Sequence, residues 1–244
     1  MLLGPIRATL LALVVMTGAA ISGAWADPLT DFNAALETAA SHNRGAIGYL
    51  RTGNVDLAEL EIDRLRESWR ELTMRFAGQR PEAFAGNPLY GPLWTGVSAQ
   101  LVAADMMLKS GRPEAAGQSL AAIRADLYEL RKASHVVVLA DCVRDATTIM
   151  DALMVYNDRA LDFAKPETRF GIASKASIYS TVLDRCDGIA SEAVRQAPEF
   201  RRLIDGKAGL ALIAQAIAMR DGDLLHRVLI ELRSFDNLLA FRFG

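Results

Sequence analysis

Histidines, cysteines and methionines are the residues of this 244-residue chain whose side chains could hold a metal ion. The histidines His42, His135 and His226 form no H-x-x-H or H-E-x-x-H spacing, and the chain has no C-x-x-C pair. Met150 and Met154 lie one helical turn apart and could offer two thioethers to a soft ion such as Cu(I). No third ligand accompanies them, so packing in a core explains them better. The spacing therefore predicts no metal site.

Nucleophilic catalysis also lacks its usual sequence signals. The chain contains no G-x-S-x-G turn, no glycine-rich phosphate loop and no histidine placed beside a serine and an acid. Acidic residues such as Glu59 and Glu61 lie close to Arg64, Arg66 and Arg70, which is typical of a solvated, ion-paired helix face. We therefore expect a protein that is not an enzyme and has no catalytic residues.

The two cysteines, Cys142 and Cys186, are predicted to form a disulfide. They lie at nearly equal distances from a turn predicted at Lys165-Pro166, so they fall at the same height on an antiparallel helical hairpin. An oxidising compartment favours a disulfide over a thiol site. Two buried, unpaired cysteines are the alternative.

The first 26 residues predict export. Segment 1–26 carries one cation, Arg7, then an apolar run over residues 10–16, and ends in Ala24-Trp25-Ala26. This is the pattern of a secretory signal peptide, and the run is short for a membrane span. We expect a periplasmic or secreted protein with no stable span after cleavage. An uncleaved membrane anchor is the alternative.

Almost every later segment has the apolar period of a helix, and no stretch alternates as a strand does. The composition, 51% hydrophobic and 23% charged with a net charge of -2, is globular and lacks the basic excess of a nucleic-acid binder. Breaks at glycine and proline delimit the helices. Eight are predicted, at about residues 29–50, 55–76, 93–109, 113–135, 141–164, 174–196, 206–220 and 223–241.

The two halves of the mature chain look alike. Three segments recur at offsets of 117, 111 and 109 residues: 80–84 as 197–200, 109–111 as 220–222, and 120–124 as 229–233. A general likeness between amphipathic hairpins is the alternative explanation. Short reversals within each half favour antiparallel neighbours. We therefore predict an all-α fold of two related antiparallel four-helix bundles, residues 27–140 and 141–244.

Residues 109–116 (KSGRPEAA) and 130–135 (LRKASH) resemble the last hairpin of the periplasmic four-helix cytochromes, the b-type haem bundle and its cytochrome c-prime relatives. The resemblance covers about residues 28–140 and implies a haem-ligating histidine near the end of the fourth helix, where His135 matches. The chain lacks the C-x-x-C-H of covalent haem attachment, and its first helix offers His42 in place of the family's methionine. At about 1.5 Å per residue, the two histidines are expected roughly 18 Å apart along the bundle.

These observations predict a non-enzymatic, exported helical bundle that acts as a partner-binding or assembly module, with a protein partner in the periplasm and no nucleic acid. Tyr90 and Trp94 lie beside a proline-rich loop and could contact that partner, or could pack against Trp69 and Phe76. One alternative is an electron carrier that binds haem b through His135, with His42 as second ligand. Another is a small-ligand or copper-binding bundle.

Overall fold

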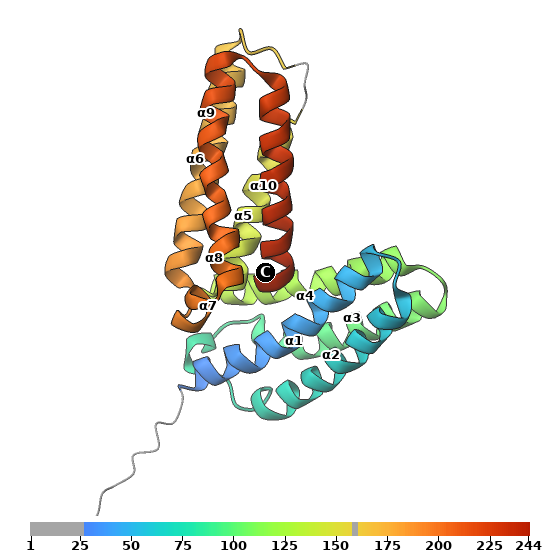
Figure 1. Cartoon of the computed structure of the whole chain (residues 1–244). Coiled ribbons are helices and arrows are strands. Elements are labelled where there is room, and N and C mark those ends of the chain that lie inside the picture. Colours follow the sequence, from blue (N-terminus) through green and yellow to red (C-terminus); the bar gives the residue numbers. More distant parts are fainter. Residues whose placement is uncertain (1–26, 158–160) are drawn as a thin grey trace, which may run out of the picture.

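The computed structural model describes residues 27–157 and 161–244, and these residues form helices without any β-strand (Figure 1). Eight helices of ten or more residues lie within the described ranges, which confirms the predicted all-α class. The predicted signal peptide falls outside the described residues. The helices are α1 (Pro28–Arg51), α2 (Val55–Phe76), α3 (Tyr90–Lys109), α4 (Pro113–Ala133), α5 (Leu139–Met154), α6 (Pro166–Ile189), α7 (Glu192–Gln196), α8 (Pro198–Asp205), α9 (Leu210–Met219) and α10 (Gly222–Phe243), with 3-10 turns η1 (Glu82–Phe84) and η2 (Gly206–Gly209).

Helices α1 to α4 form the first bundle. Its buried residues recur at alternating spacings of four and three, which is the seam of helices packed side by side. In α2 they are Ala58, Ile62, Leu65, Trp69, Leu72 and Phe76. Tight turns reverse the chain after α1 and after α3, where Gly53 and Gly111 take positive φ angles of 75° and 70°. Neighbouring helices are therefore antiparallel.

The second bundle consists of α5, α6, α9 and α10, and the short α7 and α8 connect α6 to α9. Cys142 in the first turn of α5 and Cys186 in the last turn of α6 form a disulfide with their Cα atoms 5.4 Å apart. This confirms the predicted pairing. The disulfide ties two adjacent helices at the end of the bundle that faces the first bundle (Figure 1).

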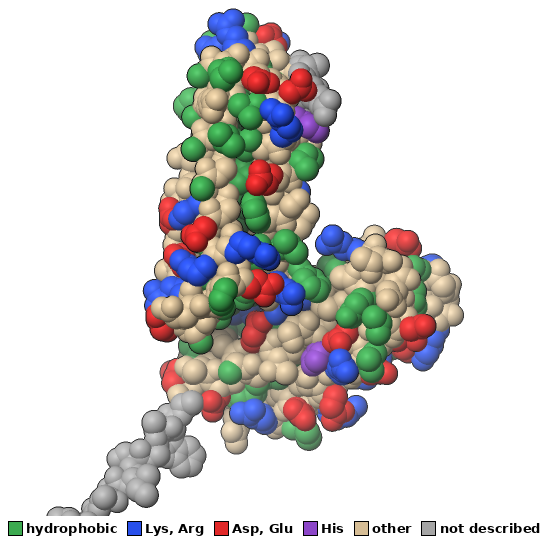
Figure 2. Space-filling model, in the orientation of Figure 1, with side chains coloured by type: hydrophobic (Ala, Val, Ile, Leu, Met, Phe, Trp, Pro, Cys, Tyr) green, Lys and Arg blue, Asp and Glu red, His purple; other side chains and the backbone are tan. Residues whose placement is uncertain are grey.

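The second bundle stands across the side of the first, with the end of α10 close to α1 and α4 (Figure 1). Each bundle keeps its own hydrophobic core, one drawn from residues 29–136 and the other from residues 139–243. The predicted division at residue 140 falls in the first turn of α5. Figure 2 shows the recessed corner that this crossing creates between the two bundles.

The helix boundaries differ from the predictions mainly in the second bundle. Helix α5 ends at Met154, ten residues before the predicted end, and α6 begins at Pro166, eight residues before the predicted start. Pro166 occupies the first turn of α6, where its missing N–H costs no hydrogen bond. The predicted helix 174–196 is broken after Ile189, because the Ser191 side chain caps α7 by accepting a hydrogen bond from the Val194 N–H at 3.3 Å.

Of the helices in the described ranges, none combines the length and the apolar character needed to cross a membrane.

Candidate functional site

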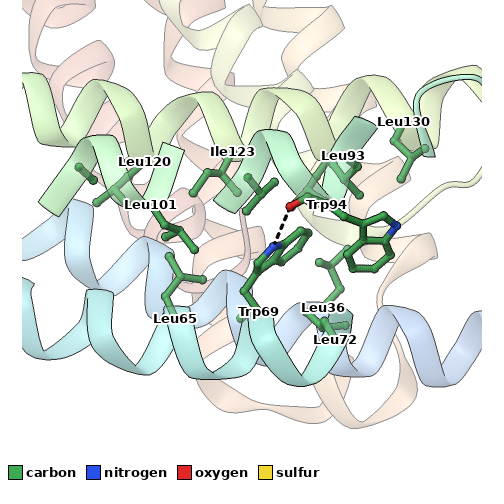
Figure 3. Close-up of a cluster of buried hydrophobic side chains, with 14 of the residues drawn as sticks. Leu36, Leu65, Trp69, Leu72, Leu93, Trp94, Leu101, Leu120, Ile123 and Leu130 are labelled. Atoms are coloured by element: carbon green, nitrogen blue, oxygen red, sulfur yellow. Dashed lines mark hydrogen bonds between the residues drawn. The ribbon is translucent and has the colours of Figure 1, made fainter. Parts of the chain in front are cut away.

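Tyr90 and Trp94, predicted as interface contacts, are buried in the first core with exposed fractions of 1% and 7%. The Tyr90 hydroxyl donates a hydrogen bond to the Phe76 carbonyl at 2.6 Å. The Trp94 ring lies 5.2 Å from that of Trp69, whose Nε1 donates to the Trp94 carbonyl at 3.4 Å (Figure 3). The interface prediction is therefore wrong for these two residues, because both lie on the seam of α3 and not beside it.

The two candidate haem ligands lie far apart. Asn43 donates a hydrogen bond from Nδ2 to the Leu120 carbonyl at 3.0 Å, which places His42 level with about residue 121 of α4. His135 comes 14 residues later, just after the end of α4, so the two histidines are separated by roughly 20 Å along the bundle. His42 Nδ1 instead contacts Glu61 Oε2 at 2.6 Å, and His135 is exposed. The haem alternative therefore lacks a second ligand from this pair.

Met150 is fully buried in the second core, and Met154 packs against that core, as the packing explanation predicts. Within residues 27–157 and 161–244, no group of three or more His, Cys, Asp or Glu side chains is placed to hold a metal ion.

The junction between the bundles contains most of the charged side chains that the helices bury. Arg131 at the end of α4 binds Asp141 in α5 through two hydrogen bonds, Nε to Oδ2 at 2.7 Å and Nη2 to Oδ1 at 2.5 Å. Both residues are buried. Nearby, the Tyr128 hydroxyl donates to Asp145 at 3.0 Å, and the Arg144 guanidinium lies 4.1 Å from the centre of the Tyr128 ring. These contacts fix α5 against α4 across the short linker at residues 134–138.

A second set of contacts joins the end of α10 to α1. Arg44 donates from Nη1 to the backbone oxygen of Gly244 at 2.9 Å and from Nη2 to Glu37 at 2.5 Å. The Phe241 ring lies against Gly48, where an added Cβ would come within 2.7 Å of a ring carbon. The missing side chain at residue 48 therefore allows the two helices to approach.

These contacts enclose a first hollow, called hollow A, with a volume of about 640 Å³. It lies between the first half of α1, the end of α4, the α4–α5 linker and the end of α10. Its wall is mainly apolar and comes from both bundles. Apolar side chains on this wall include Leu36, Leu127, Val138, Leu139, Ile189 and Phe243.

A second hollow, called hollow B, has a volume of about 330 Å³ and lies between the second half of α1, α4, α5 and α10. Its charged wall residues are Arg44, Arg51, Arg124 and Arg144. Arg124 and Arg144 line both hollows. The pKa of Arg124 is lowered, first because burial penalises its charge and then because the positive charges of Arg44 and Arg144 lie close to it.

The arginines of the junction are the residues that the sequence reasoning missed. Arg124 and Arg131 share a helical face with Tyr128, beside the apolar seam of α4, and helical periodicity alone does not show that this face is covered. The second bundle covers this flank, and that contact depends on tertiary structure.

Comparison with family models, with curated proteins and with solved structures found no match to this chain. The resemblance to the four-helix cytochromes therefore stays a prediction, and the function has to be argued from the junction.

Proposed function

We propose that this protein is a non-enzymatic, exported binding module whose ligand occupies hollow A. The observation that carries the proposal is the volume of about 640 Å³ in a mainly apolar wall at the junction of two bundles. Ligand sites in proteins typically enclose about 300 to 1,000 Å³, are mostly apolar, and lie at domain interfaces. Hollow A has all three properties.

The chemistry of the wall supports binding in preference to catalysis. Among the described residues that line hollow A there is no histidine or cysteine, and its hydroxyls come from Thr30 and Ser191. Ser191 already accepts the hydrogen bond that caps α7. The carboxylates Glu37 and Asp141 are each bound by an arginine. The groups present can orient a ligand, but no nucleophile is paired with a base.

The apolar part of the wall indicates what kind of molecule would bind. Leu36 and Leu127 come from the first bundle, Val138 from the linker, and Ile189 and Phe243 from the second bundle. A small, mainly apolar molecule would remove surface of both bundles from water at once. This proposal therefore takes up the small-ligand alternative named in the sequence analysis, in place of the protein partner that was expected first. Export itself is supported by the signal-peptide pattern together with the disulfide.

The test uses N-phenyl-1-naphthylamine, an uncharged dye that fluoresces when it leaves water. We expect saturable binding of one dye per chain. Ala34 is an exposed residue of α1 on the wall of hollow A, so Ala34→Trp should fill the hollow and reduce dye binding by about tenfold or more. Ala99→Trp on α3, also an exposed alanine and not on that wall, is the matched control.

Far-UV circular dichroism must show that both variants keep the helical content of the parent protein. The proposal fails if the dye does not bind, or if Ala34→Trp and Ala99→Trp bind it equally well.

A further inference from the structure

Hollow B is distinguished by its charge. Its wall receives Arg44 and Arg51 from α1, Arg124 from α4 and Arg144 from α5, and none of the described residues that line it carries a carboxylate. The other polar residues of this wall are neutral and come from the second bundle: Thr147, Thr148 and Asn237. Four arginines thus line one small space, and no carboxylate lines it with them.

Two of these arginines have hydrogen-bonding capacity that the described part of the chain does not use, although Arg144 also stacks on the Tyr128 ring. Arg124 makes no hydrogen bond or ion pair with any residue in the described ranges, although it lies close enough to Arg44 and Arg144 for their charges to lower its pKa. The Nη1 atom of Arg144 is buried and has no hydrogen-bond partner in the described part of the chain. A buried donor without a partner costs free energy, because it has lost its hydrogen bonds to water. A bound anion would remove this cost.

Arg44, by contrast, has hydrogen-bond partners within the protein. Its guanidinium binds Glu37 on its own helix and the backbone oxygen of Gly244 from α10. Arg131 is likewise satisfied by the two oxygens of Asp141. Arg124 lies between these residues on the same side of the first bundle and has no equivalent acid.

We infer that hollow B binds a phosphate group, carried either by a small soluble molecule or by a lipid headgroup. Guanidinium groups pair with phosphate through two parallel hydrogen bonds, and the pairing is stronger because both partners are charged. Arginines reach hollow B from three different helices. The tetrahedral oxygens of a phosphate can accept from several directions at once, whereas the two oxygens of a carboxylate lie in one plane.

The size of hollow B agrees with this ligand class. About 330 Å³ lies at the lower end of the range for small-molecule sites. The ligand class is therefore a phosphate ester or a diphosphate of small size. This inference goes beyond the proposed function, because hollow B could bind phosphate whether or not a molecule occupies hollow A.

The experiment titrates sodium pyrophosphate into the disulfide-bonded protein by isothermal titration calorimetry. We expect one site. Arg124→Gln and Arg144→Gln should each weaken binding by about tenfold or more, because each removes a charge-assisted pair. Arg51→Gln, at an exposed position at the end of α1, should weaken binding less and cannot disturb a core. Arg112→Gln removes the same charge at an exposed position at the distal turn before α4 and should change nothing.

A second arm uses vesicles of phosphatidylcholine with and without phosphatidylglycerol, in a sedimentation assay. Binding to pyrophosphate identifies a soluble ligand class. Binding only to the phosphatidylglycerol vesicles, lost in Arg124→Gln, identifies a headgroup. The inference is overturned if neither probe binds, if binding survives in both Arg124→Gln and Arg144→Gln, or if Arg112→Gln weakens it equally.

The two proposals can fail separately. Ala34→Trp fills hollow A and leaves the wall of hollow B unchanged, so it should reduce dye binding without affecting pyrophosphate binding. If the parent protein does not bind the dye, only the proposed function of hollow A is contradicted.

Discussion

Asp236 is a carboxylate in α10 with no exposed surface, in the core of the second bundle. It accepts a hydrogen bond from the Tyr179 hydroxyl at 3.2 Å and one from the Thr147 hydroxyl at the long distance of 3.5 Å. The Arg233 guanidinium approaches its other oxygen at 3.4 Å. Burial raises the pKa of Asp236 from 3.8 to about 6, although Arg233 and the two hydrogen bonds oppose the change and the charge of Asp151 adds to it.

This shift determines a pH dependence of stability and its sign. Because the pKa of Asp236 is higher in the folded than in the unfolded protein, the folded state binds the proton more tightly. The contribution of Asp236 to the free energy of unfolding is therefore most favourable below about pH 4, and it is lost as the pH rises through about 6. A shift from 3.8 to about 6, at about 1.4 kcal/mol per pKa unit, makes the ionised carboxylate cost about 3 kcal/mol at neutral pH.

The perturbation is Asp236→Asn, which keeps an oxygen that can accept from Tyr179 but removes the charge. Urea unfolding, followed by far-UV circular dichroism, measures the free energy of unfolding at about pH 4 and about pH 7.5. Between them, the advantage of the variant over the parent should grow by about 2.5 kcal/mol. Asp63→Asn, at an exposed position in α2, controls for the loss of any carboxylate and should leave the pH dependence unchanged. If Asp236→Asn and the parent lose stability in parallel over this range, the reasoning is refuted.

Three further changes test the packing. Asp141→Ala leaves the buried Arg131 guanidinium without its partner and should lower the free energy of unfolding by about 3 to 5 kcal/mol in urea titrations; a loss below about 1 kcal/mol would contradict a buried pair. Replacing both Cys142 and Cys186 with serine removes a cross-link between residues 44 positions apart in the sequence. The free energy of unfolding should fall by about 4 kcal/mol in the same assay, so an unchanged urea midpoint would argue against the disulfide. Trp94→Ala removes a side chain from the core and should lower the free energy of unfolding by about 3 to 5 kcal/mol. The affinities for the dye and for pyrophosphate, measured below the melting temperature of the variant, should not change. A loss of binding in the folded variant would show that Trp94 is a contact residue after all.

The helices of the first bundle could be predicted closely, because the sequence pattern indicates both the buried face and the ends of each helix. The predicted helix 55–76 coincides with α2, where the buried residues follow a regular spacing and Gly53 lies before the start. The proline at residue 113 begins α4 as predicted. The error at Tyr90 and Trp94 arose because proximity to a loop suggested exposure, whereas the same seam continues into that turn of the helix.

The second bundle was predicted correctly in its pairing and incorrectly in its helix ends. The disulfide required only the antiparallel register, and that register extends to the far end of the hairpin, where Gly171 lies against the Tyr156 hydroxyl. The midpoint of residues 142 and 186 is 164, and that of residues 156 and 171 is 163.5. The register of α5 against α6 is therefore the same at both ends of the hairpin, even though α5 ends at Met154 and α6 begins at Pro166.

The junction needed more than periodicity, but the sequence does contain a signal for it. In α2 the arginines Arg64, Arg66 and Arg70 each have an acid three residues earlier, and each binds that acid.

Arg44, Arg51 and Arg124 have no acid three or four residues away on either side. Such an arginine has no acid within one helical turn, so its charge must be solvated by water or balanced by a more distant residue or by a ligand. Arg44 finds Glu37 and the backbone oxygen of Gly244, 200 residues away. Arg124 finds neither, although burial and two neighbouring positive charges both penalise its own charge. A ligand phosphate in hollow B would supply the missing counter-charge, and for this reason the phosphate inference centres on Arg124.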